Sequence, residues 1–199
     1  MVRYPAAETA EKHERILSEA SRLFRERGLA GVSVGDLMKA ADLTHGSFYN
    51  HFDSKPSLVA ECITHVCALA VGQIEAAKPT DAGKRAFVSK YLSLTARDEP
   101  GRACLMSSLG PEIARESAAR PAMTRYVRTF IEKVASHFPW PAPADARRDA
   151  IRMTASLVGA LVLARAVDDE ALSKEILQEV IGQFAGDGQR DVRKRRAAD

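Results

Sequence analysis

The stretch that decides the fold is SVGDLMKAADLTHGSFYNHFDSKPSLV, residues 33–59. Its spacing of apolar residues predicts two short helices, over residues 36–41 and 45–51, joined by a tight turn. Ser33 and Asp36 stand at the spacing of a capping box, which marks where the first of these helices begins. Two short helices joined in this way and braced by a third form a helix-turn-helix, which reads base edges in the major groove of DNA.

The bracing helix is predicted just upstream, over residues 9–27. Ile16, Ala20, Leu23 and Phe24 recur at helical spacing and form one apolar stripe, with charged residues on the other faces. Such a stripe packs against the two short helices and gives them a core.

The rest of the chain also carries helical patterns, and no β-hairpin signal interrupts them. After a helix running from about residue 55 to 78, further helices are predicted at 81–97, 102–118, 121–137, 144–168 and 170–185. Gly110-Pro111 is predicted to kink or split the segment that contains it. The sequence therefore predicts an all-α protein of about nine helices.

Composition and charge exclude several classes of protein. A net charge of +3 is too small to identify a nucleic-acid-binding domain, so DNA binding has to be argued from a site. Three cysteines without a CxxC spacing predict neither a disulfide framework nor a zinc site. The N-terminus lacks a signal-peptide core, and no apolar run approaches the length of a membrane span. We expect a soluble, cytoplasmic protein without metal, cofactor or membrane partner.

LTHGSFYNHFDSKPSLV, residues 43–59, resembles the DNA-binding signature of the TetR family of transcriptional regulators. The residues that match the family pattern are Thr44, Gly46, Tyr49, His51, Phe52, Lys55 and Leu58. The segment FRERGLAGVSVGDLMKAADL, residues 24–43, fits as well, whereas the likeness is looser beyond residue 60. The resemblance implies a helix-turn-helix domain over residues 1–54 and a helical ligand-binding and dimerisation domain over residues 55–185. Residues 186–199 are predicted to be a basic, disordered tail.

The predicted DNA contacts come from the short helices and the start of the helix that follows them: Ser33, Thr44, His45, Gly46, Ser47, Tyr49, His51 and Lys55. His45 and Ser47 are candidates for base contact, and Gly46 would let the backbone approach the groove closely. Tyr49, His51 and Lys55 carry donors suited to phosphate. Ser33 and Thr44 could bind phosphate or could serve only as helix caps.

The resemblance also implies a pocket for a small-molecule inducer among the C-terminal helices. Its candidate lining residues are Val66, Leu69, Cys104, Met106, Leu109, Tyr126, Phe130 and Trp140. Each of them is more often ordinary core than pocket wall, because apolar residues at helical spacing are the normal core signal. A mostly apolar ligand is the default expectation for such a pocket.

Two apolar helices near the C-terminus predict a homodimer. The candidate interface residues are Leu157, Leu161, Ile176, Val180 and Phe184. The alternative is that both stripes fill the core of one protomer. Dimerisation suits a short helix-turn-helix, which usually reads two half-sites separated by a turn of DNA or more.

The implied function is a repressor that a small-molecule inducer releases from a palindromic operator. Cys104 offers a second hypothesis, a repressor that senses oxidants or electrophiles, because a thiol at a helix start beside an arginine favours the reactive thiolate. The segment PGRACLMSSLGPEIARES also resembles a Gly-x-x-Cys-Leu element of one branch of the family. More remote alternatives are an all-α enzyme, for which the sequence has no catalytic motif, a helical binding protein without DNA recognition, and a non-specific DNA coat.

Overall fold

The structure, a computed structural model, describes residues 6–185, and it packs as two compact units. The first unit holds the chain up to Ala70 together with Pro100–Thr129. The second holds Val71–Glu99 together with the described residues from Phe130 on. The tail predicted at 186–199 lies outside the described residues.

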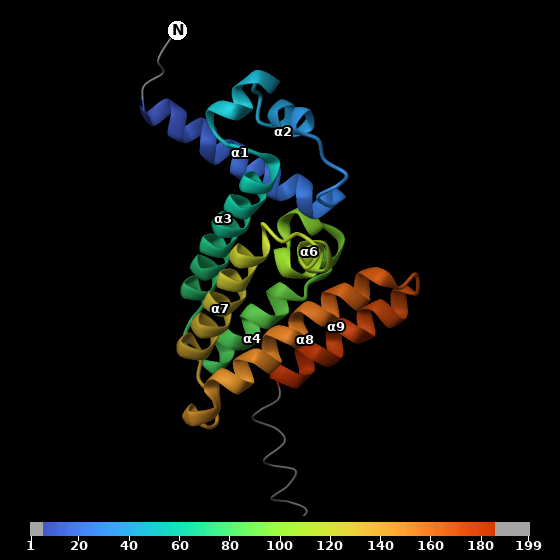
Figure 1. The fold of residues 1–199 in the computed structure, drawn as a ribbon. Coiled ribbons are helices and arrows are strands. Elements are labelled where there is room, and N and C mark those ends of the chain that lie inside the picture. The colour runs from blue at the N-terminus through green and yellow to red at the C-terminus, as the bar shows by residue number, and fades with distance from the viewer. Residues whose placement is uncertain (1–5, 186–199) are drawn as a thin grey trace, which may run out of the picture. The chain divides into compact units, whose positions relative to one another are not determined.

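The described residues form helices and no strand, which confirms the all-α prediction (Figure 1). The helices of this part of the chain are nine α-helices and three short 3-10 helices. In chain order they are α1 Ala6–Arg27, α2 Val34–Ala40, η1 His45–Asn50, α3 Lys55–Ala76, α4 Asp81–Tyr91, α5 Leu94–Asp98, η2 Pro100–Arg102, α6 Leu105–Ile113, α7 Arg120–His137, η3 Pro143–Asp145, α8 Ala146–Ala166 and α9 Glu170–Ala185.

The first unit contains the predicted helix-turn-helix and its brace. The apolar stripe of α1 is confirmed as core, since Ile16 and Ala20 are fully buried and Phe24 nearly so. α2 packs between α1 and η1 and buries Leu37 and Met38 completely. Two helices this short would be marginally stable in isolation. Burial of their apolar surface holds them in a fixed position.

The turn between α2 and η1 ends α2 in a Schellman arrangement. The N–H of Leu43 donates to the carbonyl of Met38 (2.8 Å), and the N–H of Asp42 donates to the carbonyl of Lys39 (3.1 Å). Asp42 takes the left-handed conformation that this turn requires, with φ of 57°. The turn therefore sets the angle between the two helices without a glycine.

Two of the predicted helices differ from those observed. The segment predicted at 81–97 is divided into α4 and α5, because Ser93 accepts a hydrogen bond from the N–H of Ala96 and starts a new helix. The segment predicted at 102–118 contains only the last residue of η2 and the nine-residue α6. Pro111 lies inside α6, which ends two residues later.

In the second unit, α8 and α9 lie side by side (Figure 1). Leu157 and Leu161 of α8, predicted to lie at a dimer interface, are fully buried inside the protomer. They complete the protomer core and are not available to a second copy, so this part of the prediction is corrected. The large apolar side chains that are most exposed on these two helices are Ile151, Val162, Leu163 and Leu172.

α3 is the one described helix whose length and composition would permit it to cross a membrane. A third of its most apolar window is buried within the protein. Leu58, Ile63 and Ile74 are among its fully buried residues. Core helices of soluble proteins show the same composition, so this feature alone does not identify a span.

Candidate nucleic-acid interface

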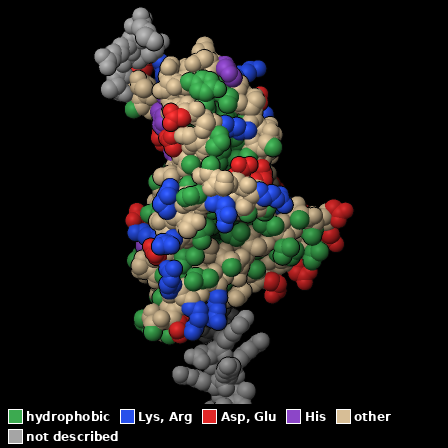
Figure 2. All heavy atoms as spheres, viewed as in Figure 1, with side chains coloured by type: hydrophobic (Ala, Val, Ile, Leu, Met, Phe, Trp, Pro, Cys, Tyr) green, Lys and Arg blue, Asp and Glu red, His purple; other side chains and the backbone are tan. Residues whose placement is uncertain are grey.

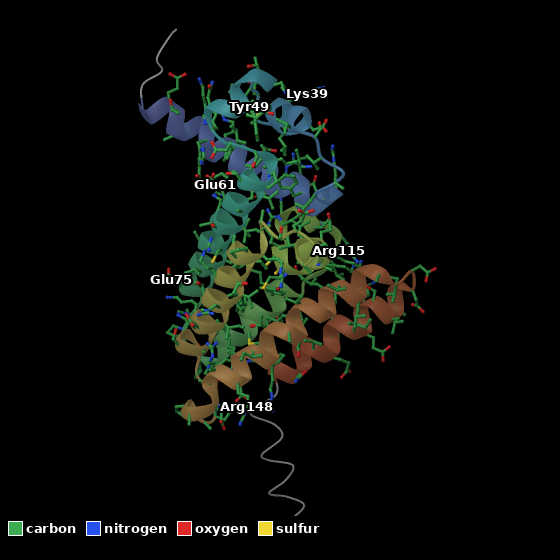
Figure 3. All side chains as sticks on the ribbon, viewed as in Figure 1. Lys39, Tyr49, Glu61, Glu75, Arg115 and Arg148 are labelled. Carbon is green, nitrogen blue, oxygen red and sulfur yellow. The ribbon has the colours of Figure 1, made fainter. Side chains whose placement is uncertain are left out.

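Buried aromatic rings hold the second helix of the motif, η1, in place. Phe48 has no exposed surface, and Phe52, just beyond the helix, is 3% exposed. Their ring centroids lie 5.6 Å apart. The neighbouring Tyr49 is 67% exposed and meets Phe48 edge to face, so its hydroxyl end is available to a partner (Figure 3). The helix thus has an anchored face and an open polar face.

Ser33 and Thr44 are each predicted to be either a helix cap or a phosphate contact. The structure shows a cap hydrogen bond for Ser33 but none for Thr44. The Ser33 hydroxyl accepts from the N–H of Asp36 (3.1 Å) and donates to its carboxylate (2.5 Å), completing the predicted capping box. The bond that the Ser33 hydroxyl donates to this carboxylate, followed by one from the backbone N–H of Ser33, holds the pKa of Asp36 below its ordinary value. Thr44 stands at the N-cap of η1 and is exposed, but its side chain makes no cap hydrogen bond.

The residues at the start of η1 are exposed or partly exposed. Nothing lies within 4 Å of the position that a Cβ on Gly46 would take. The His45 ring lies close to Gly35 at the start of α2, 3.7 Å from a Cβ placed there. The Ser47 hydroxyl donates to the Thr44 carbonyl (2.7 Å) and keeps its lone pairs as acceptors.

His51 and Lys55 make contacts inside the protein. His51 is half-buried with its ring centroid 5.9 Å from that of His13, and burial, followed by the charges of His13 and Lys12, lowers its pKa. At neutral pH it is therefore a neutral hydrogen-bonding group. Lys55 donates to the carbonyl of Leu29, which ties the start of α3 to the end of α1.

The surface of the helix-turn-helix carries little positive charge. Between Gly28 and Ser54 the one Lys or Arg is Lys39, against Asp36, Asp42 and Asp53. Lys39 is exposed at the end of α2, at the same end of the first unit as Tyr49 (Figure 3). No motif distinguished it in the sequence, since an isolated surface lysine is common. Any DNA contact made here depends mainly on neutral donors and on this one lysine.

The candidate pocket residues are mostly interior. Val66, Met106, Leu109, Tyr126 and Phe130 are each buried to more than nine-tenths. Leu69 is 53% exposed and lies at the surface of α3.

Trp140, also a pocket candidate, has structural contacts of its own. Its indole N–H donates to the carbonyl of Ala135 (3.1 Å), and the Lys84 ammonium lies 4.7 Å from its ring centroid. The same ammonium donates to the Pro139 carbonyl (2.7 Å), which fixes the loop before η3.

Cys104 lies at the N-cap of α6 and is half-buried. Its thiol lies beside the buried hydroxyl of Tyr126, whose pKa is raised first by burial and then by the neighbouring Cys104. Cys62, in contrast, is buried, and its burial raises the pKa of its thiol to about 12. No group of three or more His, Cys, Asp or Glu side chains within residues 6–185 is arranged to hold a metal ion.

Comparison with known proteins finds a family whose model matches part of this chain. Residues 16–62 match the family model described as bacterial regulatory proteins, tetR family. The repressor KstR2 of Rhodococcus jostii is 45% identical over 62 residues, and the regulator AcrR of Shigella flexneri is 36% identical over 75 residues. The aligned parts cover 30% and 38% of this chain, and 30% and 34% of those proteins, about a third of their length.

The likeness of fold extends further than the likeness of sequence. The crystal structure of reduced NemR from E. coli superposes with a TM-score of 0.73 at 19% identity, covering 87% of this chain and 95% of that one. At this identity the match shows a shared fold. The matched sequence segment includes α2, η1 and the exposed residues of the candidate interface.

Proposed function

Because this chain belongs to the TetR family of DNA-binding transcriptional regulators, we propose that it is a repressor released by a small-molecule inducer. Two protomers would place their η1 helices in successive major grooves of a palindromic operator. An inducer bound among the C-terminal helices would favour a conformation in which the two helices no longer match that spacing. We infer a cytoplasmic location, where the DNA is, and no catalytic role.

One observation carries the proposal: the polar face of η1 is exposed while its apolar face is anchored. Tyr49, Gly46 and Thr44 present unobstructed groups, whereas Phe48 is fully buried. Such a helix can enter a groove without rearranging, and rigid presentation reduces the ordering cost of binding. The Ser33 hydroxyl already serves in a capping box, so we assign it a smaller share of phosphate binding than Thr44.

The experiment that tests this function is fluorescence anisotropy with DNA from upstream of the protein's own gene, against scrambled DNA, at physiological salt. We expect selective binding, and Tyr49→Phe should weaken it by about tenfold per protomer, since only the phosphate-bonding hydroxyl is lost. Equal and weak binding of both DNAs would contradict a local regulator. A genome-wide binding selection would then separate a distant operator from the absence of specific binding.

We also propose that α8 and α9 form the homodimer interface, through the residues that the protomer leaves accessible. Val162 and Leu163 of α8 are 37% and 56% exposed, and Figure 2 shows hydrophobic side chains at the surface over these helices. On α9 the predicted interface residues that remain partly accessible are Ile176, Val180 and Phe184.

Leu163→Glu should convert the dimer to a monomer, because two carboxylates would be buried without partners in the interface. Light scattering coupled to size-exclusion chromatography measures the expected halving of the mass. Leu94→Glu, at an apolar residue of α5 that is 44% exposed, is the matched control and should remain dimeric. A Leu163→Glu variant of unchanged mass would place the interface elsewhere.

A second candidate function is regulation through Cys104, supported by the position of its thiol beside Tyr126 and by its partial exposure. Alkylation with a small maleimide would then add bulk at the start of α6 and weaken operator binding. Cys104→Ala is the control, since it should bind DNA and ignore the reagent. Unchanged affinity after complete alkylation would remove this candidate.

A further inference from the structure

One residue of the turn between α1 and α2, Leu29, is held from both sides by charged side chains. Its N–H donates to the Glu112 carboxylate of α6 (2.7 Å). Its carbonyl accepts from the Lys55 ammonium at the start of α3. Leu29 is buried and stands four residues before Ser33, which caps α2. Two elements outside the helix-turn-helix therefore fix the point from which its first helix begins.

The Glu112 carboxylate occupies an unusual place, at the C-terminal end of α1. Gly28 follows the last residue of α1 with φ of 77°, and its N–H donates to the carbonyl of Phe24 (2.9 Å). In a Schellman end the next N–H would also return to the helix, but the N–H of Leu29 goes to Glu112. A helix C-terminus repels anions, so this carboxylate is held against the helix dipole by its hydrogen bond from the N–H of Leu29. A contact of this kind is sensitive to small displacements.

Two features favour glycine at position 28. Its left-handed conformation is one that other residues rarely adopt. In addition, a Cβ on Gly28 would lie 2.9 Å from Oε1 of Glu112, closer than ordinary contact. The end of α1 is therefore shaped to admit a carboxylate from α6.

The segment that leads into α6 is attached to the same end of α1. The Arg25 guanidinium donates to the carbonyl of Ala103 (2.8 Å). Gly101 of η2 packs so closely against the Glu26 carboxylate that a Cβ on it would lie 2.3 Å from that group. With Glu112, these contacts join η2 and α6 to the last turn of α1 at both ends of the segment. A displacement of α6 would then reach the turn at Leu29 through these contacts.

We propose that Glu112 is a positioning residue for DNA recognition. It couples α6 to the helix-turn-helix through its hydrogen bond to the N–H of Leu29. Lys55 holds the carbonyl of the same residue. The inference rests on the proposed DNA-binding function and names the contact through which that function is controlled. While Glu112 holds the N–H of Leu29, α2 starts from a fixed point and presents η1 in one orientation. A shift of α6, the helix whose N-cap is Cys104, would withdraw the carboxylate and leave η1 in a range of orientations.

The test compares Glu112→Ala and Glu112→Gln with the unmodified protein. Hydrogen exchange of the Leu29 amide is followed by NMR without DNA, and the Kd is measured for DNA from upstream of the gene. We expect Glu112→Ala to speed exchange at Leu29 by about ten- to a hundredfold. Operator binding should weaken by about 5- to 150-fold, the usual range of coupling between sites. Glu112→Gln keeps an acceptor oxygen, so it should restore part of the slow exchange at Leu29 and part of the affinity for the operator.

Two controls separate positioning from general loss of stability. Glu116→Ala, at an exposed carboxylate shortly after α6, should change neither quantity. The amide of Tyr126, in α7 of the same unit, should exchange at its original rate in all variants, whereas global destabilisation would speed it.

The outcomes are distinct. Faster exchange at Leu29 with unchanged operator affinity would overturn the proposal, and so would unchanged exchange. If the unmodified protein binds no DNA selectively, the proposed function itself fails. That failure is recognised before any variant is made.

Discussion

Gly46→Leu should weaken operator binding by roughly a hundredfold or more while the protein stays folded. Nothing surrounds the position that a side chain would take, so leucine, a better helix former than glycine, meets no steric conflict within the protein. On the DNA the same side chain would hold η1 away from the groove. Loss of a base contact costs about 1–3 kcal/mol, and the dimer loses it in both half-sites.

The measurement is anisotropy with operator DNA beside thermal unfolding of the free protein. Gly72→Leu is a matched control, because Gly72 is also an exposed helical glycine with open space around it, on α3. We expect that variant to keep full affinity. Full affinity in Gly46→Leu would mean that η1 does not enter the groove by this face.

Phe48→Ala should lower the free energy of unfolding of the first unit by about 3–5 kcal/mol, the usual cost of removing a buried phenylalanine. Phe48 is completely buried, and its ring contacts those of Phe52 and Tyr49. Since domains are stable by only about 5–15 kcal/mol, the helix-turn-helix would be open much of the time and DNA binding would be lost.

Urea unfolding monitored by circular dichroism gives the free energy. The control is the neighbouring aromatic residue, because Tyr49→Ala removes a ring that is 67% exposed and should change stability little while losing DNA binding. The two variants therefore reach the same loss of function by different causes. A smaller loss of stability in Phe48→Ala than in Tyr49→Ala would contradict the anchoring role of Phe48.

The sequence predicts the helix-turn-helix well because its signals are local. The capping box at Ser33 and the stripe that includes Phe24 depend on residues three to eight positions apart, and both are confirmed. Local signals fail where two of them compete. The apolar pattern over residues 81–97 predicts a single helix. Ser93 instead caps a new helix within that segment, so the cap outweighs the apolar pattern.

Contacts between distant parts of the chain could not be predicted in this way. Glu112 lies 83 residues from Leu29, and nothing in its neighbourhood distinguishes it from other surface carboxylates. Lys55 fits a DNA-binding motif, yet its ammonium binds a carbonyl of the protein. An apolar stripe likewise does not say what covers it, which is why Leu157 and Leu161 were assigned to a second protomer while they belong to the core of their own.

The near absence of positive charge on the helix-turn-helix has a consequence for how the protein is distributed in a cell. DNA without an operator holds proteins mainly through phosphate neutralisation and the release of counterions. Because Lys39 is the one Lys or Arg between Gly28 and Ser54, the attraction that this segment contributes is small. Few molecules should then be stored along the chromosome, so a small number of copies suffices for each operator. For the proposed repressor, occupancy of the operator should also change little as the surrounding ionic strength rises, because few phosphate contacts are lost to salt.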